Sequence, residues 1–210
     1  MGVSFGNDCE CCMLKAKDLG YCIEDKIIFE NLNFEISWGE RVLLKGKNGS
    51  GKSSLLGILQ GFLKPSFGVV ERERELRVGY LFQESEDQFI APSVLEDVAF
   101  SLLAKGEERA EMRAREMLER LEISHLSEKS LYHLSGGEQR LVALAGVLVL
   151  ECDLYLLDEP FNEIDSLRQE IIKSIIQEKN GAFLIATHGG LEWEREIILH
   201  SHTQLHSDSL

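Results

Sequence analysis

Three short stretches of the chain are almost wholly apolar, and a charge or a glycine bounds each of them. They are RVLLKG at 41–46, LYLLD at 154–158 and AFLIAT at 182–187. Short apolar runs with such borders are typical of parallel strands that are buried on both faces. Helical patterns occupy Lys52–Leu63 and Ile164–Gln177. This alternation predicts an α/β fold with a doubly wound parallel sheet.

The first part of the chain has a different pattern. MLKAKDLGYCI at 13–23 and NLNFEIS at 31–37 place polar residues among apolar ones. This mixture suits antiparallel strands that keep one face in water. We therefore expect an N-terminal antiparallel β region in front of the parallel core.

The middle of the chain is helical in pattern from Val94 to about Leu121. Ser93 and Glu96 have the spacing of a capping box at its start. One apolar face and two ion pairs at favourable spacing support the helix: the face is Ala110, Ala114, Met117, Leu118 and Leu121, and the pairs are Glu111 with Arg115 and Glu116 with Arg120.

This helical block interrupts the α/β alternation. We therefore expect a single domain over 1–210, in which a helical subdomain at 86–151 is inserted into a core formed by 1–85 and 152–210.

A second helix start lies in LSGGEQR at 134–140. Ser135 and Glu138 form a capping box there, with Gly136 and Gly137 between them. Glycine costs about 1 kcal/mol against alanine inside a helix, so these two glycines serve something other than helix stability. Free amides at a helix N-terminus, with no side chain in the way, are suited to binding an anion.

The loop GKNGSGKS at 46–53 fits the phosphate-binding pattern G-x-x-x-x-G-K-S, between an apolar strand and a helix. In this pattern the backbone amides wrap the β-phosphate, Lys52 reaches the β- and γ-phosphates, and the Ser53 hydroxyl binds Mg²⁺. The candidate nucleotide-binding residues are Gly46, Lys47, Asn48, Gly49, Ser50, Gly51, Lys52, Ser53 and Ser54.

Chemically useful residues follow the other buried strands. Asp158 and Glu159 end LYLLD, and His188 follows AFLIAT. Strand tips at the carboxyl edge of a parallel sheet converge on one crevice. We expect Asp158 to hold the water shell of the metal and Glu159 to polarise the attacking water.

Three further residues have two interpretations each. Gln83 bridges Mg²⁺ and the attacking water, or is a polar residue at a strand end. His188 bonds the γ-phosphate, or caps its strand. Tyr21 stacks on adenine, or lies half in the core.

The composition removes several other classes of protein. A net charge of −14 over 210 residues argues against binding duplex nucleic acid or anionic lipid, and we expect no nucleic-acid partner. No apolar run reaches the roughly 20 residues that a membrane span needs, and MGVSFGNDCECC is no secretory signal. We expect a cytosolic protein with reduced thiols; a metal site at CECC is the less favoured alternative.

The order of the motifs resembles a known family. A phosphate-binding loop, Gln83, LSGGE, LYLLDE, Asp165 and His188 follow one another as in the ATPase subunits of ABC transporters. The resemblance implies a P-loop NTPase (RecA-like) core that binds ATP and Mg²⁺ and hydrolyses ATP. It also implies that two subunits pair head to tail, so that Ser135, Gly136, Gly137 and Glu138 of one cover the γ-phosphate bound by the other.

A finer resemblance is to the energy-coupling factor importers of vitamins or of cobalt and nickel. VGYLFQESEDQFIAPSVLEDVAF at 78–100 and ALAGVL at 143–148 are similar to that group. It implies that Gln83 through Ile90 contacts a transmembrane partner, which places the subunit on the cytoplasmic face of the inner membrane. Glu84 and Ser85, Leu141 and the FNEID turn before Asp165 depart from the usual pattern.

Two alternatives remain open at this stage. One is a soluble ABC-type ATPase of DNA repair or translation, although the chain has neither a long coiled coil nor two cassettes. The other is a regulatory module that senses ATP without hydrolysing it, an alternative that the altered FNEID turn keeps open. In the family that the sequence resembles, the membrane partners select the cargo.

Overall fold

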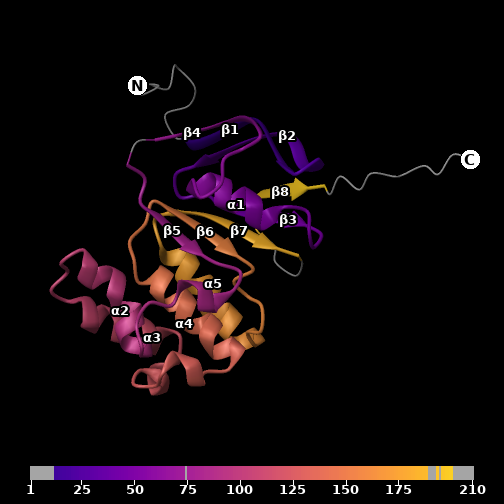
Figure 1. Ribbon diagram of the computed structural model, residues 1–210. Helices are drawn as coiled ribbons and strands as arrows, with labels where there is room; N and C mark the ends of the chain where they lie inside the picture. Colours follow the sequence, from indigo (N-terminus) through magenta and orange to yellow (C-terminus); the bar gives the residue numbers. More distant parts are fainter. Residues whose placement is uncertain (1–11, 74, 189–192, 194, 201–210) are drawn as a thin grey trace, which may run out of the picture.

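The computed structural model describes residues 12–73, 75–188, 193 and 195–200. It contains a three-stranded antiparallel sheet in the order β2-β1-β4 and a five-stranded parallel sheet in the order β5-β6-β7-β3-β8. Helix α1 lies between the two sheets, and helices α2 to α5 lie on the opposite side of the parallel sheet (Figure 1). The α/β fold predicted from the hydrophobic pattern is therefore confirmed.

The strands and helices have the following bounds. The antiparallel strands are β1 (Cys12–Ile23), β2 (Lys26–Ser37) and β4 (Phe67–Arg72). The parallel strands are β3 (Arg41–Gly46), β5 (Val78–Leu81), β6 (Leu154–Asp158), β7 (Ala182–Thr187) and β8 (Arg195–Leu199). The helices are α1 (Lys52–Gln60), α2 (Val94–Ala104), α3 (Ala110–Arg120), α4 (Gly136–Leu148) and α5 (Ser166–Glu178), with short 3-10 turns at Ser85–Gln88, Ser124–Leu126 and Leu131–His133.

The parallel sheet is buried on both faces, and alternate residues of one strand enter different cores. On β6, Leu154 and Leu156 join the core beneath α1 and the antiparallel sheet. Tyr155 and Leu157 point the other way, into the core formed with α2 to α5. This explains why LYLLD has no polar position until its last residue: neither face meets water.

Within the part of the chain that the structure describes, no helix is long and apolar enough to cross a bilayer.

Two helix predictions are wrong in their bounds. The region 94–121 is two helices, because the chain leaves helical geometry after Ala104 and turns at Gly106, where φ is 73°. Helix α1 ends at Gln60 rather than Leu63, because Gly61 takes a left-handed conformation and its amide donates back to Gly57 and Ile58.

The capping box predicted at Ser93 is absent. The Ser93 hydroxyl bonds the Glu96 carboxylate at 2.6 Å and makes no bond to the helix amides. The amides of Val94 and Leu95 instead donate to backbone carbonyls of the 127–129 turn, so the start of α2 does not need the serine.

Of the two predicted ion pairs on α3, only one forms. Arg115 meets Glu111, whereas Arg120 turns to Glu178 on α5, at 2.6 Å. Strand β8 was not recognised from the sequence; it pairs with β3 at the edge of the sheet.

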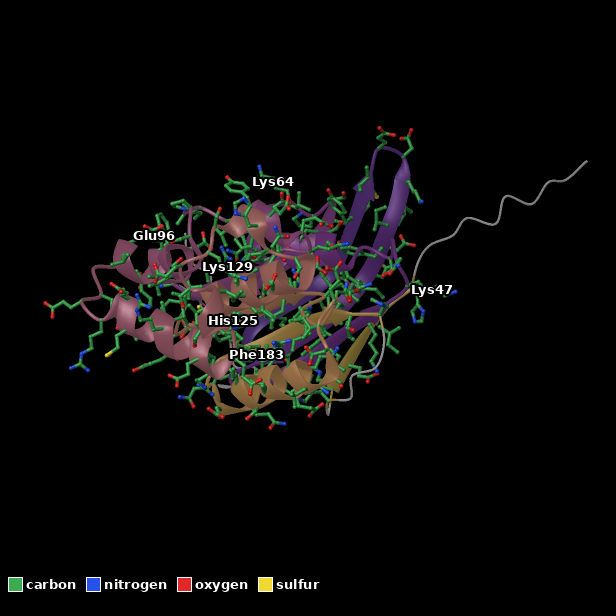
Figure 2. All side chains as sticks on the ribbon, turned by 90° about the horizontal axis from the view of Figure 1, so that it is seen from below. Lys47, Lys64, Glu96, His125, Lys129 and Phe183 are labelled. Carbon is green, nitrogen blue, oxygen red and sulfur yellow. The ribbon has the colours of Figure 1, made fainter. Side chains whose placement is uncertain are left out.

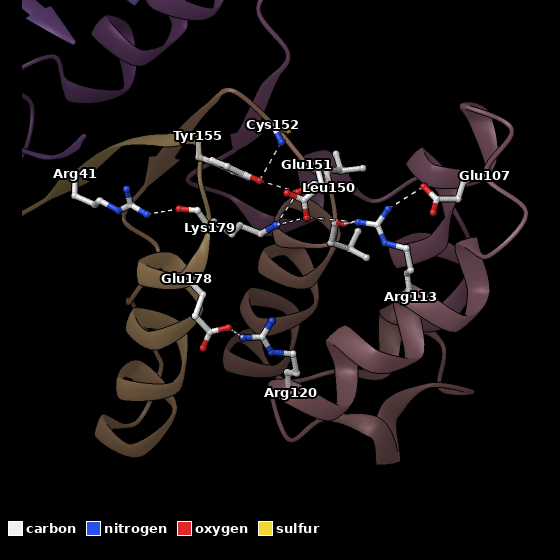
Figure 3. A network of polar contacts seen from close by, with 11 residues as sticks. Arg41, Glu107, Arg113, Arg120, Leu150, Glu151, Cys152, Tyr155, Glu178 and Lys179 are labelled. Atoms are coloured by element: carbon white, nitrogen blue, oxygen red, sulfur yellow. Dashed lines mark hydrogen bonds and ion pairs between the residues drawn. The ribbon is translucent and has the colours of Figure 1, made fainter. Parts of the chain in front are cut away.

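A polar network holds the connection between α4 and β6 (Figure 3). The Tyr155 hydroxyl donates to Leu150 O at 2.7 Å and accepts from the Cys152 amide at 3.0 Å. Lys179 donates to the same Leu150 carbonyl at 3.0 Å, and its ammonium lies over the Tyr155 ring. From α3, Arg113 donates to Val149 O at 2.7 Å. These bonds satisfy the backbone where the chain returns from α4 to the sheet.

We expect Tyr155→Phe to lower the free energy of unfolding by about 1 to 3 kcal/mol, because the buried Cys152 amide loses its acceptor. Urea denaturation followed by circular dichroism measures the change. Tyr132→Phe is the matched control, since Tyr132 is 88% exposed. Equal stability of the two variants would contradict the role given to the Tyr155 hydroxyl.

Candidate functional site

The phosphate-binding loop joins β3 to α1 and forms the floor of a pocket of about 320 Å³. Gly51 must be glycine here for two reasons. Its φ is 95°, and a Cβ would lie 2.5 Å from Ile28 Cγ2 and 2.9 Å from Phe29 Cδ1. The loop can therefore tuck under the β1–β2 hairpin. The pocket lining is Ile23, Ile28, Asn48, Gly49, Gly51, Lys52, Ser53, Ser54, Gln83, Asp158 and Glu159.

Three of the predicted loop residues do not line the pocket. Lys47 is exposed and points away from the body of the molecule (Figure 2). Gly46 lies behind the loop, where its carbonyl accepts from Lys52 Nζ at 3.0 Å. Ser50 is buried, with its hydroxyl unpaired.

Tyr21 is not part of the pocket wall. It packs against the core beneath the antiparallel sheet, with its ring 6.2 Å from that of Phe29. Tyr21 is thus partly buried, and its stacking on adenine stays a prediction. Ile23 and Ile28, at the end of the same hairpin, face the pocket instead. The sequence predicts neither of these two isoleucines as a pocket residue, because the pattern of a strand does not indicate which hairpin residues will lie over a distant loop.

Lys52, Glu159 and His188 come together from the starts or ends of three different elements. Lys52 Nζ lies 3.3 Å from Glu159 Oε1, and both side chains are almost wholly buried. His188 Nδ1 lies 2.9 Å from Glu159 Oε2 on the open side of the site. Glu159 therefore has an ammonium on one oxygen and an imidazole on the other, an arrangement that fixes its orientation.

Glu159 also has an unusual backbone. Its φ is +48°, a left-handed conformation that non-glycine residues seldom adopt. Its amide donates to Ala186 O of the neighbouring strand β7 at 3.0 Å. Strained residues of this kind gather at functional sites, where the surrounding structure holds them in place.

Ser53, Gln83 and Asp158 form a second group of side chains. The Ser53 hydroxyl donates to Gln83 Oε1 at 3.2 Å and is also within hydrogen-bonding reach of the Asp158 carboxylate, so its single proton serves one of these two oxygens at a time. Asp158 is buried, and its Oδ1 has no hydrogen-bond partner among the residues that the structure describes. Burial raises the pKa of Asp158, although hydrogen bonding from Ser53 opposes that rise. Mg²⁺ is a hard cation that prefers oxygen ligands, and this group offers it a hydroxyl, an amide oxygen and a carboxylate oxygen.

The capping box predicted at the start of α4 is present. The Ser135 hydroxyl accepts from the Glu138 amide at 3.4 Å, and Glu138 Oε2 accepts from the Ser135 amide at 2.8 Å. These bonds from Ser135 hold the pKa of Glu138 below its ordinary value. Ser135 and Gly136 are exposed, so this end of the helix is accessible.

Gly136 and Gly137 belong to LSGGE at 134–138, which we call the signature, and α4 is the signature helix. Both glycines also meet their own chain. A Cβ on Gly136 would lie 2.2 Å from Glu163 Oε2, and a Cβ on Gly137 would lie 2.6 Å from Glu163 O. Glu163 belongs to the FNEID turn and has φ +61°. One reason for glycine at these two positions is therefore intramolecular, because the turn that contains Glu163 occupies the space that side chains would need. This contact adds a second demand to the ligand approach that the sequence predicts for these glycines.

The cysteine-rich start of the chain is only partly described. Cys9 and Cys11 of CECC lie outside the described residues. Cys12 is buried, and its thiol bonds Leu14 O at 3.4 Å. Among the residues that the structure does describe, no group of three or more His, Cys, Asp or Glu could hold a metal ion.

Known proteins resemble the chain in both sequence and structure. A family model described as ABC transporter matches residues 29–162. The energy-coupling factor transporter ATP-binding protein EcfA of Methanothermobacter thermautotrophicus is 38% identical over 169 residues, which cover 73% of this chain and 54% of that protein. The structure of the present chain is similar to that of cbiO1 from Clostridium perfringens, which is part of the ABC transporter complex cbiONQ. The identity is 31% and the TM-score 0.71, with coverage of 86% of this chain and 80% of that one.

A third similarity is to the ATP-binding cassette MJ0796, solved as a dimer in a post-hydrolysis state with ADP and Pi. The identity is 28% and the TM-score 0.73, with coverage of 84% of this chain and 88% of that one. The family match takes in more than half of the chain, and the chain therefore belongs to the ABC transporter family. It carries the ATP-binding ATPase domain of that family. It spans between 48% and 63% of the length of the first curated relatives it matches.

We expect opposite effects from two glycine substitutions on the same helix. Gly137→Ala forces the backbone carbonyl of Glu163 to move and lowers the free energy of unfolding by about 1 to 3 kcal/mol. Gly146→Ala meets no atom within 4 Å and raises it by about 0.5 to 1 kcal/mol. Urea denaturation of both variants measures the difference. A stabilising Gly137→Ala would show that the turn does not pack on the signature.

Proposed function

We propose that this chain binds ATP with Mg²⁺, hydrolyses it, and powers an importer in the membrane as one half of a head-to-tail dimer. The convergence of Lys52, Glu159 and His188 with Ser53, Gln83 and Asp158 around one pocket carries the proposal. Similarity to a cassette solved with ADP and Pi supports the same activity.

The positions of Lys52, Glu159 and His188 suit different roles in ATP hydrolysis. Lys52 lies at the pocket floor, where an ammonium offsets charge on the β- and γ-phosphates. Glu159 takes the proton of the attacking water, and its buried position beside Lys52 restricts the directions in which it can accept. His188, half exposed on the far side of Glu159, donates to the γ-phosphate and keeps the carboxylate turned toward the water.

Ser53, Gln83 and Asp158 are the residues that would hold Mg²⁺, with Asp158 acting through water. The bound ion supplies positive charge that stabilises the phosphate oxygens. The unsatisfied Asp158 Oδ1 supports this assignment, because a buried carboxylate oxygen without a partner is costly unless a ligand completes it.

The accessible start of α4 supports the dimer. Ser135, Gly136, Gly137 and Glu138 present a capped, glycine-containing helix N-terminus that faces solvent in one copy. Such an end favours a phosphate. We propose that it covers the γ-phosphate bound by the second ATPase subunit, as the dimeric state of the similar cassette suggests.

The surface next to Gln83 supports a membrane partner. A groove of about 290 Å³ lies between the 86–92 segment and the 131–139 segment, and it is lined by Glu86, Phe89, Ile90, Ala91, Pro92, Leu131, Tyr132 and Gln139. Ile90 and Tyr132 are among the most exposed large apolar side chains that the structure describes. We propose that a transmembrane subunit of an energy-coupling-factor-type importer of vitamins or metal ions docks here and holds the ATPase on the cytoplasmic face of the membrane.

We expect Glu159→Gln to lower the rate of ATP hydrolysis by about 10² to 10⁴-fold, because the amide cannot accept the proton. ATP binding persists and ATP shifts the chain to a stable dimer. Phosphate release and analytical ultracentrifugation measure the two effects. Glu178→Gln, which alters a surface pair with Arg120, is the control and leaves hydrolysis unchanged. Wild-type turnover in Glu159→Gln would refute the role of the carboxylate.

We expect Tyr132→Glu to release the subunit from its membrane complex, because the groove would gain a charge at its apolar rim. Hydrolysis by the isolated subunit remains. The measurement is recovery of the tagged subunit in purified membranes. Leu167→Glu is the control, since it adds the same charge at another exposed apolar position, on α5. Equal retention of both variants would place the docking surface elsewhere.

A further inference from the structure

Arg140 is a cation enclosed within the protein. It lies on α4, five residues after the cap Ser135, and is only 4% exposed. Its hydrogen-bond acceptors are carbonyl and hydroxyl oxygens. Burying a guanidinium is costly unless its donors are bonded. The hydrogen bonds of Arg140 offset this cost and also hold the acceptor groups in place.

The guanidinium reaches the ends of two neighbouring parallel strands. Its Nη1 donates to Phe82 O at 2.6 Å, to Gln83 O at 3.1 Å and to Ser85 Oγ at 3.4 Å, all just beyond β5. Its Nη2 donates to Asp158 O at the end of β6. One planar group therefore fixes both backbone segments, and it does so from the signature helix.

These two segments carry the side chains that meet at Ser53. The Gln83 amide oxygen accepts from the Ser53 hydroxyl, and the same hydroxyl is within hydrogen-bonding reach of the Asp158 carboxylate. The side chains of Gln83 and Asp158 thus face the proposed metal, while Arg140 holds their own carbonyls from the other side. A shift of either strand end would misplace a metal-facing oxygen.

A lysine could not replace the arginine. The acceptors lie in different directions, and the guanidinium presents several donors in a rigid fork, whereas an ammonium is one point charge on a flexible stem. Burial lowers the pKa of Arg140 to about 10, which still leaves it charged at neutral pH.

We propose that Arg140 is a positioning residue for ATP hydrolysis: it joins the signature helix to the backbone of Gln83 and Asp158 and so sets the geometry of the divalent-cation site. The inference rests on the proposed function and adds to it a residue that does not touch the nucleotide. It also means that displacement of the signature helix changes the cation site of its own subunit.

The test compares Arg140→Lys with wild type in the full chain. Mn²⁺ serves as the probe, and electron paramagnetic resonance measures its binding with ADP present. We expect Mn²⁺ affinity to fall by about tenfold, as for other residues that orient metal ligands, and the rate of hydrolysis to fall by about 10- to 100-fold. Binding of ADP without a divalent cation stays within about twofold, because the loop Gly46–Ser53 is untouched. Hydrogen exchange of the 82–85 and 157–159 amides rises.

Arg113→Lys is the matched control. Arg113 also donates to a backbone carbonyl, Val149 O at 2.7 Å, near the opposite end of α4. It lies outside the site, so its loss lowers stability without changing Mn²⁺ affinity. Should Arg140→Lys not fold, Arg140→Gln, which is neutral and keeps two donors, undergoes the same measurements.

The outcomes separate the two proposals. Unchanged Mn²⁺ affinity and unchanged exchange at 82–85 and 157–159 in a folded Arg140 variant overturn the positioning role, while ATP hydrolysis by the wild type remains. Equal loss of Mn²⁺ affinity in Arg113→Lys overturns it too, because the effect would then follow stability alone. A wild-type chain that neither binds Mn²⁺ with ADP nor hydrolyses ATP overturns the proposed function.

Discussion

Burial of the parallel sheet on both faces is the constraint on which the site depends. The side chains of β3, β6 and β7 are divided between two apolar cores. A slip of one residue would turn each side chain into the opposite core, where the close packing is fitted to other side chains. The strands therefore end at fixed positions. Asp158 is the last residue of β6, and Glu159 and His188 directly follow β6 and β7. The loop after β3 leads to Lys52 at the start of α1. The packing of the core therefore determines the distances within the site.

The sequence predicts well whatever is local or repeated along one strand. The loop from Gly46 to Ser53, the acidic end of β6 and the cap at Ser135 are all recognisable because each depends on neighbouring residues only. Ser93 has the same spacing as Ser135, yet its cap does not form, because carbonyls from the distant 127–129 turn satisfy the helix first. A capping pattern therefore predicts a helix start more reliably than it predicts the bonds there.

What the sequence does not predict depends on contacts between distant segments. Ile23 and Ile28 face the pocket only because the β1–β2 hairpin folds over Gly51, and the steric demand at Gly51 is the matching half of that contact. Glu163 lies against Gly136 and Gly137 although 26 or more positions separate them in the chain. The departure of FNEID from the family pattern indicates that this turn is unusual, but it does not predict that the turn contacts Gly136 and Gly137.

Two separate requirements favour glycine at the two signature positions. One is accessibility of the helix N-terminus to an anion, and the other is close packing of the Glu163 backbone and carboxylate. A carboxylate beside a phosphate-binding helix end is unfavourable once the phosphate arrives, since like charges repel. The left-handed backbone at Glu163 and at Glu159, four residues earlier, shows that this turn is held under strain between the proposed general base and the start of α4.

Arg140 and Leu141 show how a departure from the family pattern can leave the architecture intact. Leu141 lies in the apolar core, where it packs with α2 to α5, so the helix face there is hydrophobic. The guanidinium one residue earlier points to the strand ends and bonds the carbonyls of Phe82, Gln83 and Asp158. Successive helix residues differ by about 100° in direction, so a charge at 140 and one at 141 reach different acceptors. The acceptors at 140 are the backbone of the proposed cation site, and hydrogen bonds within one chain therefore join α4 to the residues proposed for hydrolysis.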